Sequence, residues 1–176
     1  MIKLRALYLP ATLSLVLVLN SCSVKKSPET VSVRLDSLFK GYYEKRMALF
    51  PLEATDNGVN DYNDRLYADF TDSYRARLRE FYSGQLAALN EFKADEIPAD
   101  QRNNVKVLRW ELEMGLRGLD LPTNRLPIDQ FWGLHLKMGQ YASGESMQPF
   151  KTVRDYDNWL SRVRAFSIWT DSAIVY

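Results

Sequence analysis

Apolar residues recur every three or four positions in four stretches of the chain, and this period is typical of amphipathic α-helices. The stretches begin near residues 30, 71, 100 and 152. Pro51 ends the first stretch and Pro122 ends the third, because proline lacks the backbone donor that a helix interior needs. No stretch of the sequence alternates apolar and polar residues for long enough to predict a strand. The pattern therefore predicts an all-α fold, with amphipathic helices packed as an incomplete helical bundle.

A long connection, residues 121–150, separates the last two stretches. A structureless loop of that length is uncommon, so we expect a short helix inside it that packs against the bundle. Thr152 and Asp155 have the spacing of a capping box and predict where the last helix begins. This helix reaches Tyr176 without a glycine, a proline or a basic final turn, which predicts a chain cut within a longer helical domain. A C-terminal helix that simply ends is the alternative.

The first 22 residues differ in pattern from the rest. Lys3 and Arg5 precede a 14-residue apolar run, residues 6–19, which is too short to span a bilayer but suits a signal peptide. The next residues, Leu19-Asn20-Ser21-Cys22, resemble the lipoprotein box of bacteria, in which the cysteine thiol receives a lipid before cleavage. We therefore expect a signal peptide at 1–21, a lipidated Cys22 with a polar tether at 22–30, and a helical domain at 31–176. An ordinary signal peptide that happens to contain a cysteine is the alternative.

Composition and charge narrow the class of protein. The chain has 176 residues, of which 46% are hydrophobic and 26% charged, as is ordinary for a folded domain with one core. Removal of the leader takes away two basic residues, which leaves 21 basic against 22 acidic residues. Basic residues alternate with acidic ones, so we expect no nucleic-acid partner. Export, acylation and the presence of Ser23 after the cysteine predict a cell-envelope protein, held on the outer membrane by its lipid.

Few residues offer chemistry for catalysis or metal binding. His135 is the only histidine, which excludes a zinc helix of the H-E-x-x-H type within this chain. Its apolar neighbours favour a packed or hydrogen-bonded structural role, although residue counts alone leave a triad with serine and aspartate open. The sequence contains no G-x-S-x-G elbow and no glycine-rich phosphate loop. Glu111 and Glu113 are two positions apart and do not share a helix face, so we expect them on a solvated face. The sequence thus predicts no catalytic residue, no cofactor and no metal ligand.

Residues 51–66, PLEATDNGVNDYNDRL, combine residues that bind metals with residues that form turns. A calcium loop needs a glycine at position 6 and a glutamate at position 12, and neither Asp56 nor Asp61 as first residue gives that spacing. A corner between two helices explains the segment better. Pro51 can start a short helical turn, Glu53 suits the positive end of its dipole, and Gly58 can take the left-handed conformation that closes it.

The same segment resembles the corner near the start of a bacterial family called domain of unknown function 885. The residues of this chain that carry the motif are Pro51, Glu53, Ala54, Thr55 and Gly58. Two further segments resemble helices of that family in the same order, NNVKVLRWELE at 103–113 and VRDYDNWLSRVRAF at 153–166. The resemblance implies a long, mostly helical protein grouped with zinc metallopeptidases, whose metal site is a His-Glu…Gly-His-His segment far downstream. None of those ligand positions exists in this chain, so the resemblance assigns it no catalytic residue.

Two hypotheses follow, from different classes of protein. In the first, the chain is the membrane-anchored N-terminal part of a zinc metallopeptidase-like hydrolase and forms a wall of its substrate cleft. It would be inactive by itself, its partner would be the missing C-terminal part of its own family domain, and zinc and a peptide substrate would be expected only in the intact protein. In the second, a complete small lipoprotein acts as a helical binding or scaffolding module. Aromatic residues of the 121–150 connection would then form the partner surface.

Overall fold

The computed structural model describes residues 30–131 and 133–176, and these residues form six α-helices and two short 3₁₀-helices. In chain order the elements are α1 (Val31–Leu49), α2 (Pro51–Asp56), η1 (Asn60–Tyr62), α3 (Asp72–Asn90), α4 (Arg102–Asp120), η2 (Thr123–Arg125), α5 (Leu134–Ala142) and α6 (Val153–Val175). Since the described residues contain no strand, the all-α prediction is confirmed. The four predicted helices are α1, α3, α4 and α6, and α5 is the short helix expected within the 121–150 connection. The predicted signal peptide and Cys22 lie outside the described residues.

Polar side chains cap the starts of three of the six described α-helices. Thr30 and Thr71 each accept a hydrogen bond from the backbone N–H three residues further on, at the starts of α1 and α3. Thr152 and Asp155 form a capping box at the start of α6. The start of α4 was expected near Asp100, but this helix begins at Arg102 after an N-cap, Gln101, that makes no side-chain cap bond. The Gln101 amide is used elsewhere, because it donates to Asp36 of α1 at 2.7 Å.

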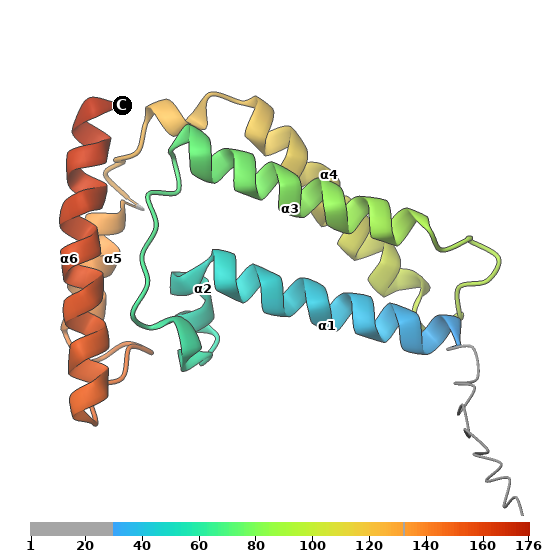
Figure 1. Cartoon of the computed structure of the whole chain (residues 1–176), viewed down its shortest axis with the longest axis horizontal. Coiled ribbons are helices and arrows are strands. Elements are labelled where there is room, and N and C mark those ends of the chain that lie inside the picture. Colours follow the sequence, from blue (N-terminus) through green and yellow to red (C-terminus); the bar gives the residue numbers. More distant parts are fainter. Residues whose placement is uncertain (1–29, 132) are drawn as a thin grey trace, which may run out of the picture.

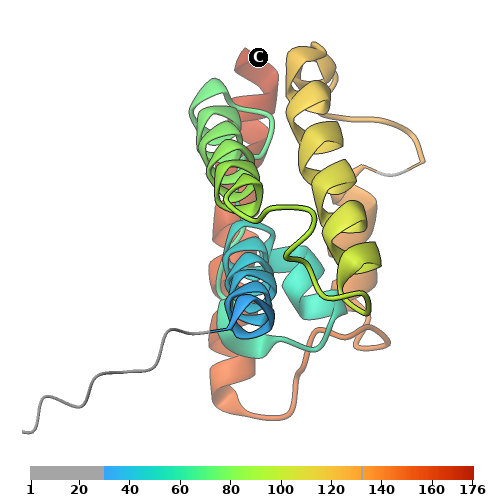
Figure 2. The same ribbon diagram turned by 90° about the vertical axis from the view of Figure 1, so that its right-hand side faces the viewer.

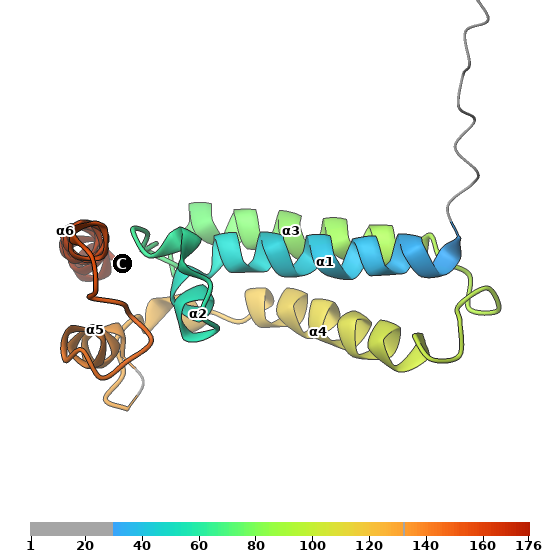
Figure 3. The ribbon, with the colours of Figure 1, turned by 90° about the horizontal axis from the view of Figure 1, so that it is seen from below.

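The helices α1, α3 and α4 run along one another as an elongated bundle that holds most of the core (Figure 1 and Figure 3). Leu35 of α1, Leu89 of α3 and Leu112 of α4 are fully buried at its centre. The ring of Tyr42 stacks on that of Phe81 with 5.5 Å between centroids. Each fully buried leucine stabilises the fold by roughly 1.5–3 kcal/mol relative to an exposed one, so this core is the main source of stability.

The pair α5 and α6 crosses one end of that bundle, and α2 lies between the two parts (Figure 1 and Figure 2). Trp169 of α6 packs edge-on against Phe70, in the connection that precedes α3, with 5.3 Å between ring centroids. Tyr141 of α5 is buried, and its hydroxyl donates to the Leu52 carbonyl of α2 at 3.0 Å. The corner predicted from residues 51–66 is therefore the junction of the molecule. Among the described residues, none of the helices combines the length and the apolar character needed to span a bilayer.

Candidate functional site

The short helix α2 and the turn after it bring the polar residues of the corner together. Proline is the first residue of α2, where its missing N–H costs no hydrogen bond, and Glu53 lies in the first turn. Gly58 has φ +76°, in the left-handed region that side chains with a Cβ rarely adopt. Its N–H donates to the Thr55 carbonyl at 2.9 Å, and the following N–H of Val59 donates to the Ala54 carbonyl at 2.8 Å. These bonds close the last turn of α2 and reverse the chain.

Arg162 of α6 enters this corner with a side chain that is 0% exposed. Its Nη2 donates to the Pro51 carbonyl at 2.9 Å and to the Thr55 hydroxyl at 2.7 Å. Nη2 also reaches the Tyr62 carbonyl at 3.1 Å, and Nε reaches the Arg65 carbonyl at the same distance. Nη1 donates to the side-chain oxygen of Gln148. One guanidinium group thus ties α6 to α2 and η1.

The groups that accept hydrogen bonds from Arg162 are neutral, so none of them balances its positive charge. Within the described part of the chain, no carboxylate lies within ion-pair distance of its guanidinium group. Removal from water lowers the pKa of Arg162 to about 10, although the nearby Tyr141, Asp64 and Asp56 act in the opposite direction. The side chain is also 5.8 Å from the centroid of the Tyr141 ring, a cation–π distance. The corner therefore holds a desolvated cation by fixed dipoles, an arrangement that costs stability unless every acceptor is in place.

Thr55, which accepts from Arg162, is bonded in turn to a second buried side chain, Asn63. Thr55 is 0% and Asn63 1% exposed. The Thr55 hydroxyl donates to the Asn63 side-chain oxygen at 2.6 Å and receives the bond from Arg162. The Asn63 amide nitrogen donates to the side-chain oxygen of Asn60 at 2.8 Å. Asn63 is thus hydrogen-bonded inside the corner.

Asp56 joins the corner to α5. One carboxylate oxygen accepts from the Tyr141 hydroxyl and the other from Lys137, each at 2.5 Å. Burial is the main cause that raises the pKa of Tyr141 well above its usual range, and the bond to the Asp56 carboxylate adds to it. The Asp56 carboxylate thus links the corner to two residues of α5.

Glu53 joins the corner to the helical bundle through Arg46 of α1. The Arg46 guanidinium donates to both oxygens of Glu53, at 2.7 and 3.0 Å, and to Glu111 of α4 at 2.7 Å. It also donates to the Tyr42 hydroxyl at 3.0 Å and lies over the Phe50 ring. Glu111, expected on a solvated face, has a side chain that is 37% exposed and pairs with this arginine. The sequence spacing of Glu111 and Glu113 is local and carries no information about an arginine 65 residues away in the chain.

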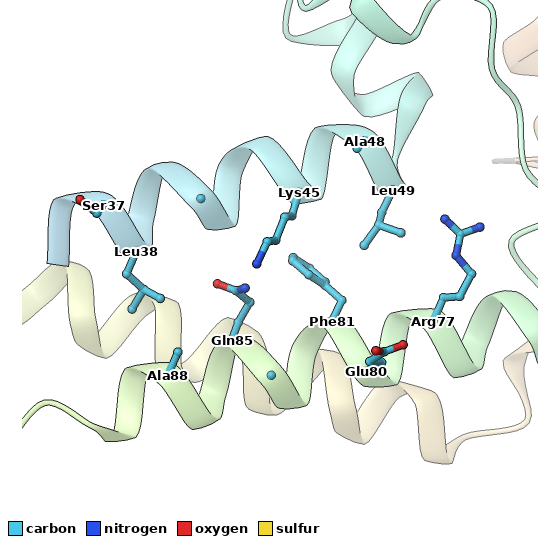
Figure 4. A pocket seen from close by; sticks show the side chains of 12 residues that line it. Ser37, Leu38, Lys45, Ala48, Leu49, Arg77, Glu80, Phe81, Gln85 and Ala88 are labelled. Carbon is cyan, nitrogen blue, oxygen red and sulfur yellow. The ribbon is translucent and has the colours of Figure 1, made fainter. Parts of the chain in front are cut away.

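A groove of about 690 Å³ lies between α1 and α3, on the bundle and away from the corner (Figure 4). Leu38 and Leu49 of α1 and Phe81 of α3 give it apolar walls, while Lys45, Arg77 and Glu80 place charges along it. Gly41 and Gly84 line it from the two helices, with open space where a Cβ would stand. Gln85 is 7% exposed, and its side-chain oxygen accepts no hydrogen bond from any described residue. The groove can hold an elongated apolar molecule with polar ends, and it contains no paired acid and base.

The residues present do not fit a catalytic metal. No group of three or more histidine, cysteine, aspartate or glutamate side chains in residues 30–131 and 133–176 is close enough to hold an ion. His135, expected as a packed or hydrogen-bonded residue, is instead exposed at the second position of α5. Its ring folds back over Gly133, where an added Cβ would meet the imidazole at 2.3 Å. Its neighbour Leu136 is also 42% exposed, so apolar neighbours in the sequence do not mark a buried position here.

The structure brings the family-motif residues into one junction but not into a catalytic arrangement. Pro51, Glu53, Ala54 and Thr55 lie within α2, and Gly58 follows it. Arg162 was missed by sequence reasoning because it occupies an ordinary polar position beside Arg164 in a helix with an apolar stripe. Cys22 lies outside the described residues, as does Trp132. Tyr141, one of the aromatic residues of the 121–150 connection, is buried in the junction.

These features define the class of protein: an all-α domain whose characteristic polar corner is a structural junction. The chain belongs to the family described as "Bacterial protein of unknown function (DUF885)", whose family model matches residues 51–176. The match begins at the first residue of the corner and includes Arg162, so both partners of the central hydrogen bonds lie within it. No curated protein and no solved structure matches the chain.

Proposed function

We propose that this chain is a cell-envelope lipoprotein, anchored through Cys22, whose helical domain is a non-catalytic scaffold. In this proposal the domain is the N-terminal part of a metallohydrolase-like protein and forms a wall of its cleft. Zinc and a peptide substrate would then engage residues outside this chain, and no reaction step is assigned to the residues described.

The observation that carries the scaffold proposal is the use of the motif's polar side chains. Glu53 pairs with Arg46, Thr55 with Arg162, and Asp56 with Lys137 and Tyr141. Each of these groups binds a residue from another helix. A polar motif whose members hold neighbouring helices in this way supports a role in positioning helices.

The anchor is tested by metabolic labelling of the full chain with radioactive palmitate in a bacterial host, followed by membrane fractionation. We expect label on the wild type and none on Cys22→Ser, and we expect the wild type to stay with the membrane after a high-salt wash. Ser23→Ala is the matched control, because it changes the neighbouring residue without removing the thiol. Equal labelling of Cys22→Ser and wild type, or an unlabelled wild type, would overturn the anchor.

The absence of catalysis in this chain is tested on the full chain extracted in detergent. Zinc content is measured by mass spectrometry after exchange into zinc-containing buffer, and hydrolysis is followed with a fluorescent casein substrate. We expect substoichiometric zinc that does not change in His135→Ala, and no hydrolysis above the buffer. One zinc per chain that is lost in His135→Ala would contradict the scaffold proposal.

A second candidate function, a binding module, is favoured by the groove between α1 and α3. Its apolar walls and its cations Lys45 and Arg77 suit an apolar ligand with an anionic group. The probe is 1-anilinonaphthalene-8-sulfonate, which has this chemistry and becomes fluorescent when it leaves water. We expect binding to the folded chain to weaken at least tenfold in Gly84→Leu, which fills the groove. Gly118→Leu is the matched control, because Gly118 also has open space at its Cβ but lies on α4. Equal binding in both variants would exclude the groove.

A further inference from the structure

A pocket of about 480 Å³ lies where the connection between α5 and α6 passes beside the turn after α2 (Figure 1). Asn60 lines it from η1, and Ser146, Gln148 and Lys151 are among the residues that line it from the connection. Among the described residues, none lines both this pocket and the groove between α1 and α3. The pocket is therefore a separate site, beside the buried corner.

Gln148 links this pocket to the corner through its side-chain amide. The residue is 2% exposed, and its Oε1 accepts from Nη1 of Arg162. Because a guanidinium group only donates, this bond fixes which end of the amide faces Arg162 and leaves Nε2 as the other end. Nε2 is buried and has no acceptor within hydrogen-bond distance in residues 30–131 and 133–176. A buried donor without an acceptor costs stability, so Nε2 favours an oxygen acceptor that enters the pocket from outside the chain.

The other polar groups that line the pocket also favour an acceptor. Lys151 forms no ion pair with any described residue. The Ser146 hydroxyl accepts from the backbone N–H of Gln148 at 3.2 Å, which leaves its own proton to donate. The side-chain oxygen of Asn60 is bound inside the corner, which leaves its amide nitrogen as the donor end.

No carboxylate competes with these donors in the pocket. No described aspartate or glutamate lines it, and the nearby Asp155 is bound to backbone N–H groups at the start of α6. A set of donors with one cation and no acid matches a ligand carboxylate, because charge-assisted hydrogen bonds are stronger than neutral ones.

Apolar side chains limit the rest of the ligand. Met147 and Phe150 line the pocket. Met147 lies against the turn, with its Cε 3.9 Å from the position of an added Cβ at Gly58. The Phe150 ring packs on that of Tyr156, with 5.2 Å between centroids. These walls suit a short apolar or aromatic group beside the carboxylate.

We propose that this pocket binds a small molecule with a carboxylate and a short apolar or aromatic body. One carboxylate oxygen accepts from Nε2 of Gln148, and the negative charge lies beside Lys151. Because the same amide accepts from Arg162, a ligand on Nε2 polarises the amide and strengthens that bond. An occupied pocket therefore stabilises the junction of α6 with the corner. The site depends neither on the lipid anchor nor on the groove between α1 and α3.

The probe is radioactive benzoate, measured by equilibrium dialysis against the full chain in dodecyl maltoside, with protein-free micelles as the blank. We expect saturable binding of one benzoate per chain. Benzamide keeps the ring and a carbonyl acceptor but lacks the charge, so it should compete more weakly by about tenfold or more. No saturable binding above the blank, or equal competition by benzamide, would overturn the proposal.

Two substitutions test the named donors. Gln148→Glu keeps an oxygen acceptor for Arg162, and so keeps the junction, but it replaces Nε2 by an oxygen that repels the ligand carboxylate. Lys151→Met removes the cation from an exposed position and leaves the bonds of the corner in place. Each should weaken benzoate binding by about tenfold or more, with the far-ultraviolet circular dichroism of the wild type. Unchanged binding in either variant would contradict the assigned contacts.

Two controls locate the site. Lys40→Met removes an exposed lysine of α1, and Gly84→Leu fills the groove between α1 and α3. Both variants should bind benzoate as the wild type does. A loss of binding in either control would show that benzoate binds elsewhere on the chain, which would also overturn the proposal.

Discussion

The guanidinium of Arg162 donates to the hydroxyl of Thr55 at 2.7 Å across 107 residues of chain, and both side chains are fully buried. This bond connects the last helix to the first corner. Because the other acceptors of Arg162 are carbonyls of the same corner and the amide of Gln148, the position of α6 depends on the shape of residues 51–65. The corner and the arginine are therefore one structural unit, although the sequence separates them.

Replacement of Arg162 should destabilise the fold more than replacement of any exposed arginine. Arg162→Ala leaves the Thr55 hydroxyl and several buried carbonyls without their donor, so we expect a loss of about 3–5 kcal/mol in the free energy of unfolding. Urea denaturation followed by tryptophan fluorescence measures it. Arg164→Ala, two residues further along on the exposed side, should change the free energy by about 0.5 kcal/mol or less. Similar losses in the two variants would show that the Arg162 bonds contribute nothing specific.

The pairing of Arg46 with Glu53 should be detectable as a coupling between two substitutions. Both oxygens of Glu53 accept from the guanidinium, and the two side chains are 24% and 34% exposed, so solvent screens the pair only in part. A double-mutant cycle of Arg46→Met and Glu53→Gln should give a coupling energy of roughly 1–2 kcal/mol. The same cycle with Lys40 and Glu44, an exposed pair on α1, should give about 0.5 kcal/mol or less. Equal coupling energies in the two cycles would show that the geometry of the Arg46–Glu53 pair adds no stability beyond that of an exposed ion pair.

Two glycines should respond in opposite directions to alanine. Gly58 has φ +76°, so Gly58→Ala should cost about 1–2 kcal/mol through backbone strain. Gly139 lies within α5 with no atom within 4 Å of an added Cβ, so Gly139→Ala should gain about 0.5–1 kcal/mol from helix propensity. Thermal unfolding of the two variants beside the wild type measures both signs. A stabilising Gly58→Ala would show that the turn after α2 relaxes to another backbone conformation.

The helices were predictable because their signals are local. The three-and-four spacing gave α1, α3, α4 and α6, and Thr152 with Asp155 forms the expected capping box. A corner was also predictable, since Pro51 fixes φ at a helix start and Gly58 can adopt the left-handed conformation that ends a helix. The start of α4 was not predictable from local signals, because the Gln101 amide donates to Asp36, a residue of another helix.

The partners of the corner could not be predicted, because they depend on the arrangement of the helices. Arg162 and Arg164 look alike in the sequence, yet one is fully buried and the other exposed. The sequence predicts a solvated Glu111 but contains no local signal for its ion pair with Arg46. A weak signal for Arg162 was present: it lies seven residues before Trp169, so the two side chains point to the same side of α6. Arg162 is buried only because α6 crosses the end of the bundle.

Stability should fall steeply above about pH 10, because four buried tyrosines resist ionisation. Burial raises the pKa of Tyr42, Tyr74, Tyr82 and Tyr141 above the usual value of 10.0. Above that pH the unfolded chain releases these protons while the native chain keeps them, so the native state binds more protons and the free energy of unfolding decreases. Each such group contributes up to about 1.4 kcal/mol per pH unit over this range. Arg162 acts in the opposite direction, since its pKa is lowered to about 10 in the native state, but it is one group against four.

The measurement is urea denaturation at intervals from pH 8.5 to 11.5, with tyrosinate absorbance followed in parallel. Tyr141→Phe removes one of the four protons, so its curve should fall less steeply than that of the wild type, by about 1.4 kcal/mol per pH unit. Gln140→Ala, an exposed change on the same helix without a titrating group, should keep the wild-type slope. At pH 7 the two variants are compared as a baseline, because Tyr141→Phe also loses the hydrogen bonds to Asp56 and Leu52. A free energy of unfolding that stays constant up to pH 11 would show that the buried phenols ionise as readily as those of the unfolded chain.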